Sequence, residues 1–257
     1  MYLDRLRLDG RLAFITGGGR GIGLACAHAM LEAGARVVIS DVNPDILGQG
    51  QEELRALGFK ADGLVLDVTR PDDVTIAAET VRQRHGHADI VVANAGMAWP
   101  DTGAEEMPDD VWLRIVDVNL NGCFWTCRAF APRMLERGKG SIVTLGSMSG
   151  LISNKPQRQA HYNAAKAGVH HLTRSLAGEW AERGVRVNCV APTYVDTLMS
   201  RGGMEDETMF PIWMENTPMK RVAKADEIAS AVLFLVGDGA SAITGTVLTV
   251  DCGYTIW

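Results

Sequence analysis

Residues 14–23 read Phe-Ile-Thr-Gly-Gly-Gly-Arg-Gly-Ile-Gly, and this stretch decides the fold of the chain. An apolar run from Leu12 to Ile15 stops at the glycine cluster, and apolar residues at helical spacing begin at Ile22. This order predicts a strand, a tight turn and a helix whose first N–H groups are free to receive a phosphate. Glycine is required because a Cβ would block both the turn and the close approach of a pyrophosphate.

A second strand and an acidic residue follow at the spacing of a dinucleotide site. The next apolar run, Arg36 to Ser40, leads to Asp41, whose carboxylate can accept hydrogen bonds from an adenosine ribose. Asp41 would also repel a 2′-phosphate, whereas Arg20 in the glycine loop would attract one. We expect NAD rather than NADP as the cofactor, because repulsion rejects NADP while an arginine merely permits it.

The composition excludes several classes of protein. The 257 residues are 47% hydrophobic and 22% charged, which is ordinary for a globular chain and excludes disorder. The net charge of −6, without a basic run, argues against a general nucleic-acid binder. No apolar stretch approaches the roughly 20 residues that span a bilayer, and residues 1–5 do not open like a secretion signal. We therefore expect a cytoplasmic protein without nucleic-acid or membrane partners.

The cysteines and histidines form no metal-binding pattern. Of the five cysteines only Cys123 and Cys127 stand one helical turn apart, and no second pair of ligands accompanies them. We expect reduced thiols and no metal site among these residues.

Strand-like apolar runs alternate with helix-period stretches along the whole chain. The runs lie at 12–16, 36–40, 63–67, 90–93, 140–145, 185–190 and 246–250. The helical stretches lie near 22–34, 44–57, 71–85, 108–137, 160–183 and 225–236. Strands that are apolar throughout predict a parallel sheet covered by helices on both faces. We expect a single doubly wound α/β domain over residues 1–257, with a seven-stranded sheet.

Residues 193–224 interrupt this alternation. They are rich in Met, Thr, Pro and acidic side chains, and they follow the carboxyl end of a strand. A long segment at that place is typical of a lid or binding loop. We expect it to be a substrate lid.

A serine, a tyrosine and a lysine are spaced for proton transfer. Ser147 follows the fifth strand-like run, and Tyr162 and Lys166 share one helix face at a spacing of four residues. An adjacent ammonium favours the phenolate form of tyrosine, which makes the side chain a workable proton acceptor. Ser147 would hold the substrate oxygen, and Asn119 would connect the lysine with solvent. Each residue alone has a commonplace interpretation, as a turn or a solvated helix face, but together behind a phosphate loop they indicate an enzyme.

The whole chain resembles the short-chain dehydrogenase/reductase family. Thr-Gly-x-x-x-Gly-x-Gly matches residues 16–23, and Asn-Ala-Gly matches residues 94–96. The resemblance implies a Rossmann domain in which the catalytic residues are Asn119, Ser147, Tyr162 and Lys166. It implies cofactor contacts at Gly17, Gly19, Arg20, Gly21, Ile22, Gly23, Asp41, Asp67, Val68, Asn94, Ala95, Gly96, Tyr162, Lys166, Pro192, Val195 and Thr197. Thr193 stands where the family has a glycine, and this departure bears on the contacts of residues 192–197.

Within the family, several details resemble the branch of galactitol, sorbitol and arabinitol dehydrogenases. They are Gly-Ser-Met-Ser-Gly at 146–150, the helix 172–180 and the ending at 250–257. Besides Ser147 and Tyr162, we expect Ser149, Asn154 and Gln157 to meet substrate hydroxyls. Trp99 and residues 198–216 would close the site.

The leading hypothesis is an oxidoreductase that moves a hydride between a nicotinamide cofactor and a secondary alcohol/ketone pair, with a polyol and its ketose as the pair. Methionine and aromatic side chains in the lid keep a 3-oxoacyl thioester reductase as an alternative. A further alternative is a catalytically silent dinucleotide-binding regulator, although the complete set of catalytic residues argues against it.

The apolar surface of two helices predicts an assembly. Residues 108–137 and 160–183 carry more apolar side chains than one sheet face can cover, and the chain ends in Ile256 and Trp257. We expect a homotetramer, which the family resemblance also implies. Some relatives hold Mg²⁺ through terminal carboxylates near a subunit axis, so the carboxylate of Trp257 is a candidate ligand.

Overall fold

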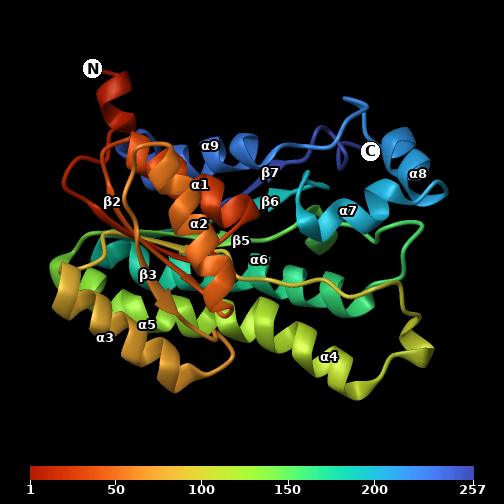
Figure 1. The fold of residues 1–257 in the computed structure, drawn as a ribbon, viewed down its shortest axis with the longest axis horizontal. Coiled ribbons are helices and arrows are strands. Elements are labelled where there is room, and N and C mark those ends of the chain that lie inside the picture. Colours follow the sequence, from red (N-terminus) through yellow and green to blue (C-terminus); the bar gives the residue numbers. More distant parts are fainter.

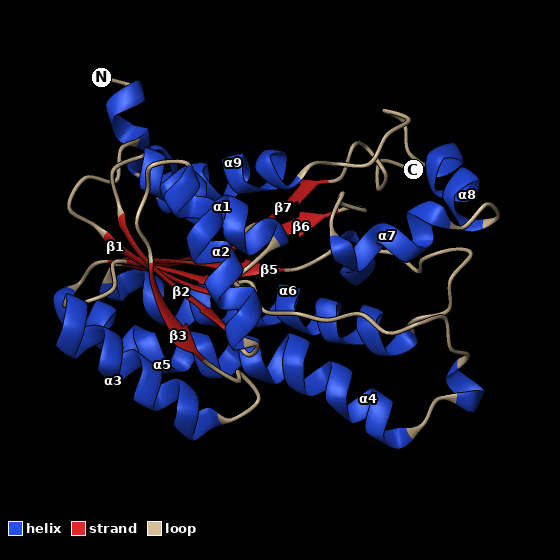
Figure 2. Ribbon diagram, viewed as in Figure 1, coloured by secondary structure: helices blue, strands red, loops and turns tan.

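A seven-stranded parallel sheet organises the molecule (Figures 1 and 2). The computed structural model describes all 257 residues. The strand order is β3-β2-β1-β4-β5-β6-β7, so the chain builds one half of the sheet outward from β1 and the other half outward from β4. The strands are β1 (Leu12–Thr16), β2 (Arg36–Asp41), β3 (Asp62–Val65), β4 (Ile90–Ala93), β5 (Gly140–Leu145), β6 (Val185–Pro192) and β7 (Val247–Val250).

Helices cover both faces of this sheet, as the apolar strands predict. Ala13 and Ile15 of β1 belong to a core that includes side chains of α1 (Gly21–Glu32), α2 (Pro44–Ala56) and α9 (Ala225–Val236). Leu12 and Phe14 belong to a second core with α3 (Pro71–His85), α5 (Gly122–Arg137) and α6 (Ala160–Trp180). Alternate residues of one strand therefore anchor opposite layers, which confirms the predicted doubly wound Rossmann architecture.

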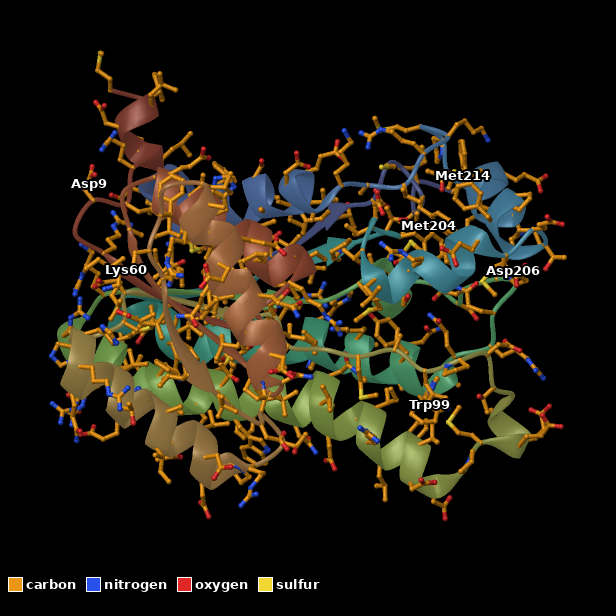
Figure 3. All side chains as sticks on the ribbon, in the orientation of Figure 1. Asp9, Lys60, Trp99, Met204, Asp206 and Met214 are labelled. Atoms are coloured by element: carbon orange, nitrogen blue, oxygen red, sulfur yellow. The ribbon has the colours of Figure 1, made fainter.

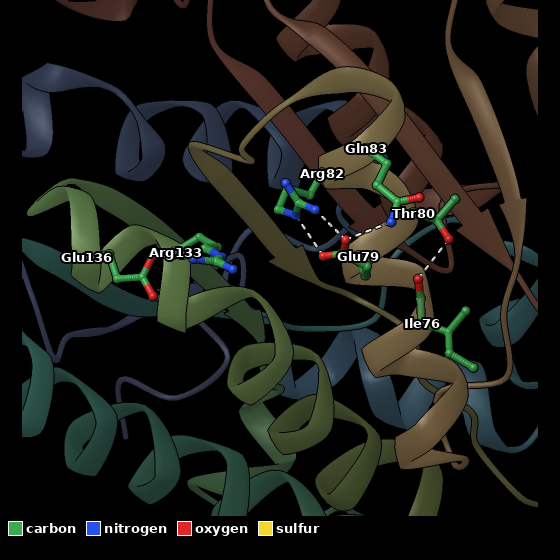
Figure 4. Close-up of polar contacts among 7 residues, drawn as sticks. All are labelled: Ile76, Glu79, Thr80, Arg82, Gln83, Arg133 and Glu136. Carbon is green, nitrogen blue, oxygen red and sulfur yellow. Dashed lines mark hydrogen bonds and ion pairs between the residues drawn. The ribbon is translucent and has the colours of Figure 1, made fainter.

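Charged side chains on α3 and α5 pair within each helix (Figure 4). The Glu79 carboxylate on α3 accepts hydrogen bonds from Arg82 Nε at 2.7 Å and from Gln83 Nε2 at 2.8 Å. These hydrogen bonds lower the pKa of Glu79 to about 2. On α5, Arg133 pairs with Glu136 at 2.6 Å. Both ion pairs lie within single helices at the surface, so they contribute little to holding α3 against α5.

The helix predicted over 108–137 contains an irregular turn. α4 (Asp109–Val116) passes through a π-helical turn (Asp117–Asn121) into α5. Within this turn the Asn119 side chain donates a hydrogen bond to the Ile115 carbonyl oxygen at 3.0 Å. A single π turn of this kind is frequent at functional sites, and here it carries a predicted catalytic residue.

The exposed apolar surface of residues 108–137 is smaller than the sequence predicts. Val111, Ile115, Phe130 and Met134 are buried in the chain's own interior. Trp112 remains 41% exposed.

No helix of the structure is both long enough and apolar enough to cross a membrane.

The segment 193–224 contains two short helices, α7 (Leu198–Glu205) and α8 (Met209–Asn216). They lie at the end of the molecule to which β6 leads, and the C-terminus lies beside α8 (Figure 1). Trp213 of α8 is only 4% exposed. A Cβ added at Gly203 of α7 would lie 2.1 Å from Trp213 Cη2. The two helices therefore pack through a glycine that leaves room for an indole.

This contact predicts opposite effects for two neighbouring glycines. Gly203→Ala should destabilise the protein by about 1–3 kcal/mol, because the added methyl group overpacks the Trp213 contact. Gly202→Ala is the matched control on the same helix, since nothing lies within 4 Å of its added Cβ. It should stabilise α7 by about 0.5–1 kcal/mol through the helix preference of alanine. Urea unfolding of both variants tests this, and equal free energies of unfolding would contradict the packing account.

Candidate active site

The glycine loop leaves β1 in a conformation that needs glycine. Gly17 has φ +60° and Gly21 has φ +57°, in the left-handed region. A Cβ at Gly23 would lie 2.1 Å from the Gly17 carbonyl oxygen, so the start of α1 packs directly on the loop. A Cβ at Gly19 would lie 2.8 Å from Ile46 of α2. The N-cap residue of α1, Arg20, makes no side-chain capping bond, which leaves the first N–H groups of the helix available to an anion.

Asn94, just after β4, holds this loop in place. Its Nδ2 donates to the carbonyl oxygens of Thr16 at 2.8 Å and Gly17 at 2.9 Å. The Thr16 hydroxyl accepts in turn from the backbone N–H groups of Asn94 at 3.1 Å and Ala95 at 3.0 Å. The hydrogen bonds of the Asn94 side chain therefore fix the shape of the loop. Gly96, two residues further on, lies beside Asn119, because a Cβ added at Gly96 would be 2.9 Å from Asn119 Oδ1.

Two carboxylates stand at the carboxyl ends of the neighbouring strands. Asp41 ends β2 and its Oδ1 accepts from the Asn43 N–H at 3.1 Å. Asp67 Oδ1 accepts from the N–H and the hydroxyl of Thr69, at 2.9 and 2.7 Å. Val68 is buried and packs on Gly122, whose added Cβ would lie 2.7 Å from Val68 Cγ2. Each carboxylate keeps further acceptor capacity at the carboxyl edge of the sheet, where ligands of such sheets bind.

Lys166 is a buried cation without a carboxylate partner. It is 4% exposed, donates from Nζ to the Leu145 carbonyl oxygen at 2.8 Å, and forms no ion pair. Its Nζ lies 5.6 Å from the centre of the Tyr162 ring. Burying an ammonium with a single acceptor is costly. Its remaining N–H groups are free to donate to a bound ligand.

Asn119 and Ser147 border the same place. Asn119 is 1% exposed, and its Nδ2 donates to the Met97 carbonyl oxygen at 2.9 Å in addition to Ile115. A Cβ on Gly96 would be 2.9 Å from Asn119 Oδ1 and 3.6 Å from Lys166 Nζ, so both side chains flank this glycine. Ser147 follows β5, and its Oγ accepts from the Ser149 N–H at 3.1 Å. The proton of the Ser147 hydroxyl is therefore free to be donated elsewhere.

Asn154 and Gln157, both predicted to meet substrate, are buried around an aromatic side chain. Tyr194 follows β6, and its hydroxyl accepts from Asn154 Nδ2 at 3.2 Å and Gln157 Nε2 at 2.8 Å. Trp213 stacks on the Tyr194 ring at 3.6 Å and donates from Nε1 to Gln157 Oε1 at 3.1 Å. The Tyr254 ring stands edge-on to Tyr194 at 5.7 Å. We call these five residues the Tyr194 cluster.

The Tyr194 cluster is neutral and incompletely hydrogen-bonded. Burial raises the pKa of Tyr194, which therefore keeps its proton. Asn154 Oδ1 and the Tyr254 hydroxyl are buried without a hydrogen-bond partner. The predicted site residues include neither Tyr194 nor Tyr254, and Trp213 is expected only as part of the lid. Trp213 lies in the predicted lid, but no sequence pattern points to Tyr254 near the C-terminus.

The remaining predicted residues lie around this centre with different exposures. Ser149 is 4% exposed, and its hydroxyl accepts from Gln159 Nε2 at 3.3 Å. Trp99 is 37% exposed and lies at the same end of the molecule as Met204 and Met214 of the lid (Figure 3). Thr197, at the start of the lid, borders the glycine loop, since its Cγ2 lies 3.5 Å from a Cβ added at Gly21.

Thr193 occupies its unusual position without backbone strain. It is not among the residues with positive φ, so the usual glycine is not required here. Its N–H donates to the Val250 carbonyl oxygen at 3.4 Å. The preceding Pro192 ends β6 beside β7, and Val195 pairs with Ala223 in a parallel bridge. This turn is thus tied to the C-terminal strand and to the end of the lid.

Comparisons with known proteins agree with this geometry. A family model described as enoyl-(acyl carrier protein) reductase matches residues 17–255. Galactitol 2-dehydrogenase of Rhizobium johnstonii is 46% identical over 256 residues, covering 100% of this chain and 99% of that protein. The crystal structure of gox2181 is 49% identical with a TM-score of 0.98, and each chain is covered completely.

A further solved structure is a gluconate 5-dehydrogenase from Burkholderia cenocepacia in complex with NADP and tartrate. It is 35% identical with a TM-score of 0.94 over 100% of both chains. Full-length identity at these levels, together with the glycine loop and the parallel sheet, decides the family. The chain belongs to the short-chain dehydrogenase/reductase family and is an NAD(P)-dependent oxidoreductase.

Proposed function

We propose that this enzyme interconverts a neutral polyol and its ketose, with NAD as the preferred cofactor. The observation that carries the proposal is the Tyr194 cluster, a buried set of uncharged hydrogen-bonding groups just beyond the Ser147 turn. Similarity to galactitol 2-dehydrogenase supports the same substrate class.

The donors and acceptors of the cluster suit a hydroxylated, uncharged chain. Asn154 Oδ1 and the Tyr254 hydroxyl have no hydrogen-bond partner in the protein. A substrate hydroxyl can donate to the first and accept from the second. A carboxylate cannot donate to Asn154, and the cluster offers it no cation. A hydrocarbon tail would leave Asn154 Oδ1 and the Tyr254 hydroxyl unsatisfied, which costs about 1–3 kcal/mol for each. A neutral polyol is therefore favoured over a sugar acid or an acyl chain.

Four side chains would carry the proton chemistry. Tyr162 accepts the hydroxyl proton of the alcohol, or returns it to the ketone in reduction. Lys166 places its ammonium group 5.6 Å from the centre of the Tyr162 ring and binds the nicotinamide ribose, while Ser147 donates its free proton to the substrate oxygen. Asn119 connects Lys166 with solvent and completes the proton relay. The bound nicotinamide supplies the hydride acceptor for the alcohol carbon.

Substrate oxidation followed at 340 nm tests the function. With NAD, wild-type enzyme should oxidise galactitol or another neutral polyol with a kcat/KM at least tenfold above that for gluconate or a 3-hydroxyacyl thioester. Tyr162→Phe should lower kcat by about 10²–10⁴-fold, because the proton acceptor is removed, while NADH binding stays near normal. Tyr2→Phe is the matched control, because Tyr2 is 88% exposed and lies 160 residues before Tyr162 in the sequence. Faster turnover of the acid or the thioester would overturn the substrate proposal.

Asp41 supports the preference for NAD. Its carboxylate accepts one hydrogen bond, from the Asn43 N–H, so acceptor capacity remains for both ribose hydroxyls. Arg20 is exposed and unpaired, and it is the group that would favour a 2′-phosphate.

The ratio of kcat/KM with NAD to that with NADP tests this preference. Wild-type enzyme should favour NAD, and Asp41→Ser should move the ratio toward NADP by tenfold or more, because the repelling carboxylate is lost. Asp45→Ser is a control acid on α2. A wild-type enzyme that works better with NADP would contradict the proposal.

We further propose a homotetramer. Ile256 and Trp257 are 66% and 82% exposed, so the chain's own subunit leaves these large apolar side chains in water. Trp112 of α4 and Leu151 after β5 are further exposed apolar groups, at 41% and 47%. Burial against a partner subunit would remove this surface from water.

Light scattering at micromolar concentration checks the assembly. The expected mass is four times that of the 27.7 kDa chain. Deletion of residues 256–257 should shift the mass toward smaller species, because it removes the docked apolar end. A monomeric mass for the full chain would contradict the tetramer.

A further inference from the structure

One face of α6 carries three functional groups along the end of β5. Tyr162, Lys166 and His170 follow one another at intervals of four residues, which places them on one side of the helix. Lys166 donates to the Leu145 carbonyl oxygen, the last residue of β5, at 2.8 Å. One turn further along, His170 Nε2 accepts a hydrogen bond from the Ser147 N–H at 3.4 Å. The helix that bears the tyrosine thus holds the backbone of the serine directly.

The chain around Ser147 is shaped to fit this imidazole. A Cβ on Gly146 would lie 2.4 Å from His170 Nε2, and a Cβ on Gly150 would lie 2.6 Å from His170 Cε1. Glycine on both sides of the serine therefore allows the turn to wrap around the ring. His170 is 2% exposed, so the contact is sealed from solvent. Neither glycine has a positive φ, and close approach is the reason for glycine at both positions.

The imidazole must be neutral to accept this bond. A neutral ring with its proton on Nδ1 presents Nε2 as an acceptor, whereas the protonated ring would only donate. Burial in the first place, and then the charges of Lys166 and Arg174, lower the pKa of His170 to about 4. The acceptor form is therefore present at neutral pH. The Nδ1 atom, which carries the proton in this form, is buried without a hydrogen-bond partner, and this is unfavourable for the free protein.

We propose that His170 is a positioning residue, which fixes the Ser147 turn in register with Tyr162 and Lys166. The inference rests on the proposed role of Ser147 in holding the substrate oxygen. Ser147 has one internal hydrogen bond to its hydroxyl, from the Ser149 N–H, so the direction of its free proton depends on where the turn sits. Proton transfer needs donor and acceptor within hydrogen-bond reach, and a displacement of about 1 Å can cost 10²-fold in rate.

Substitutions that separate bulk from hydrogen bonding test the proposal. His170→Leu keeps the apolar bulk and removes the acceptor, and it should lower kcat by about 10–100-fold. NADH affinity, measured by fluorescence, should stay within twofold, because Ser147 does not hold the cofactor. His170→Gln places an amide oxygen near the position of Nε2 and should recover most of kcat. If the His170 ring merely filled the core, His170→Leu would have the higher kcat and His170→Gln the lower, since leucine suits an apolar interior better than glutamine. His171→Leu, at the exposed neighbouring histidine, is the matched control and should retain wild-type kcat.

A double-mutant cycle with Ser147→Ala decides whether the effect passes through the serine. If His170 acts by positioning Ser147, His170→Leu should add less than twofold to the loss already caused by Ser147→Ala. Additive losses, or a His170→Leu enzyme with wild-type kcat, would overturn the inference. If Ser147→Ala itself leaves kcat unchanged, the proposed role of Ser147 fails as well. Should His170→Leu not fold, His170→Asn replaces it, because its shorter amide cannot reach the Ser147 N–H.

Discussion

The molecule depends on the bonds that Asn94 makes across the centre of the sheet. β1 and β4 are neighbours in space, yet the chain runs outward through β2 and β3 before it returns to β4. The crevice for a ligand opens at such a reversal of strand order. Asn94 follows β4 and donates to the Thr16 and Gly17 carbonyl oxygens, so it joins the two halves at this point. Without these bonds the carbonyl groups of a loop that must stay open for a pyrophosphate would lack buried partners.

The second half of the site is arranged around α6, which gathers groups from distant parts of the chain. Lys166 reaches back to Leu145 and His170 to Ser147, so the end of β5 is attached to the helix at two successive turns. Asn119 enters from the π turn and meets Gly96 near Lys166. A rigid helix thus supports the proton-transfer groups, whereas the surrounding loops form the lid and the cofactor crevice. This division is expected where geometry at the reacting atoms has to be held closely.

The strands and the order of functional motifs could be predicted from the sequence because each is a local pattern. β4 and β5 have the predicted bounds, since continuous apolar runs between turn residues mark fully buried strands. The π turn at Asp117–Asn121 could not be predicted, because it depends on a side chain taking a backbone acceptor rather than on apolar spacing. The same holds for α7 and α8, where long-range packing of Trp213 orders a stretch that reads as a loop. The bond between Trp213 and Gln157 spans 56 residues, a pairing that no local pattern contains.

The unsatisfied polar groups of the structure concentrate at the site rather than in the two hydrophobic cores. Buried side-chain atoms without a hydrogen-bond partner belong to Asn154, His161, His170, Thr193 and Tyr254. Asn154 and Tyr254 belong to the Tyr194 cluster, Thr193 precedes Tyr194 in the chain, and His161 precedes Tyr162. Each unpaired buried group lowers the stability of the free protein, whereas a well-packed apolar side chain at the same place would carry no such penalty. Under the proposed function, Asn154 Oδ1 and the Tyr254 hydroxyl are the two of these groups that a polyol would meet, so binding would offset part of their cost to the stability of the free enzyme. The two hydrophobic cores contain none of these unpaired side-chain atoms, so they stabilise the fold without this penalty.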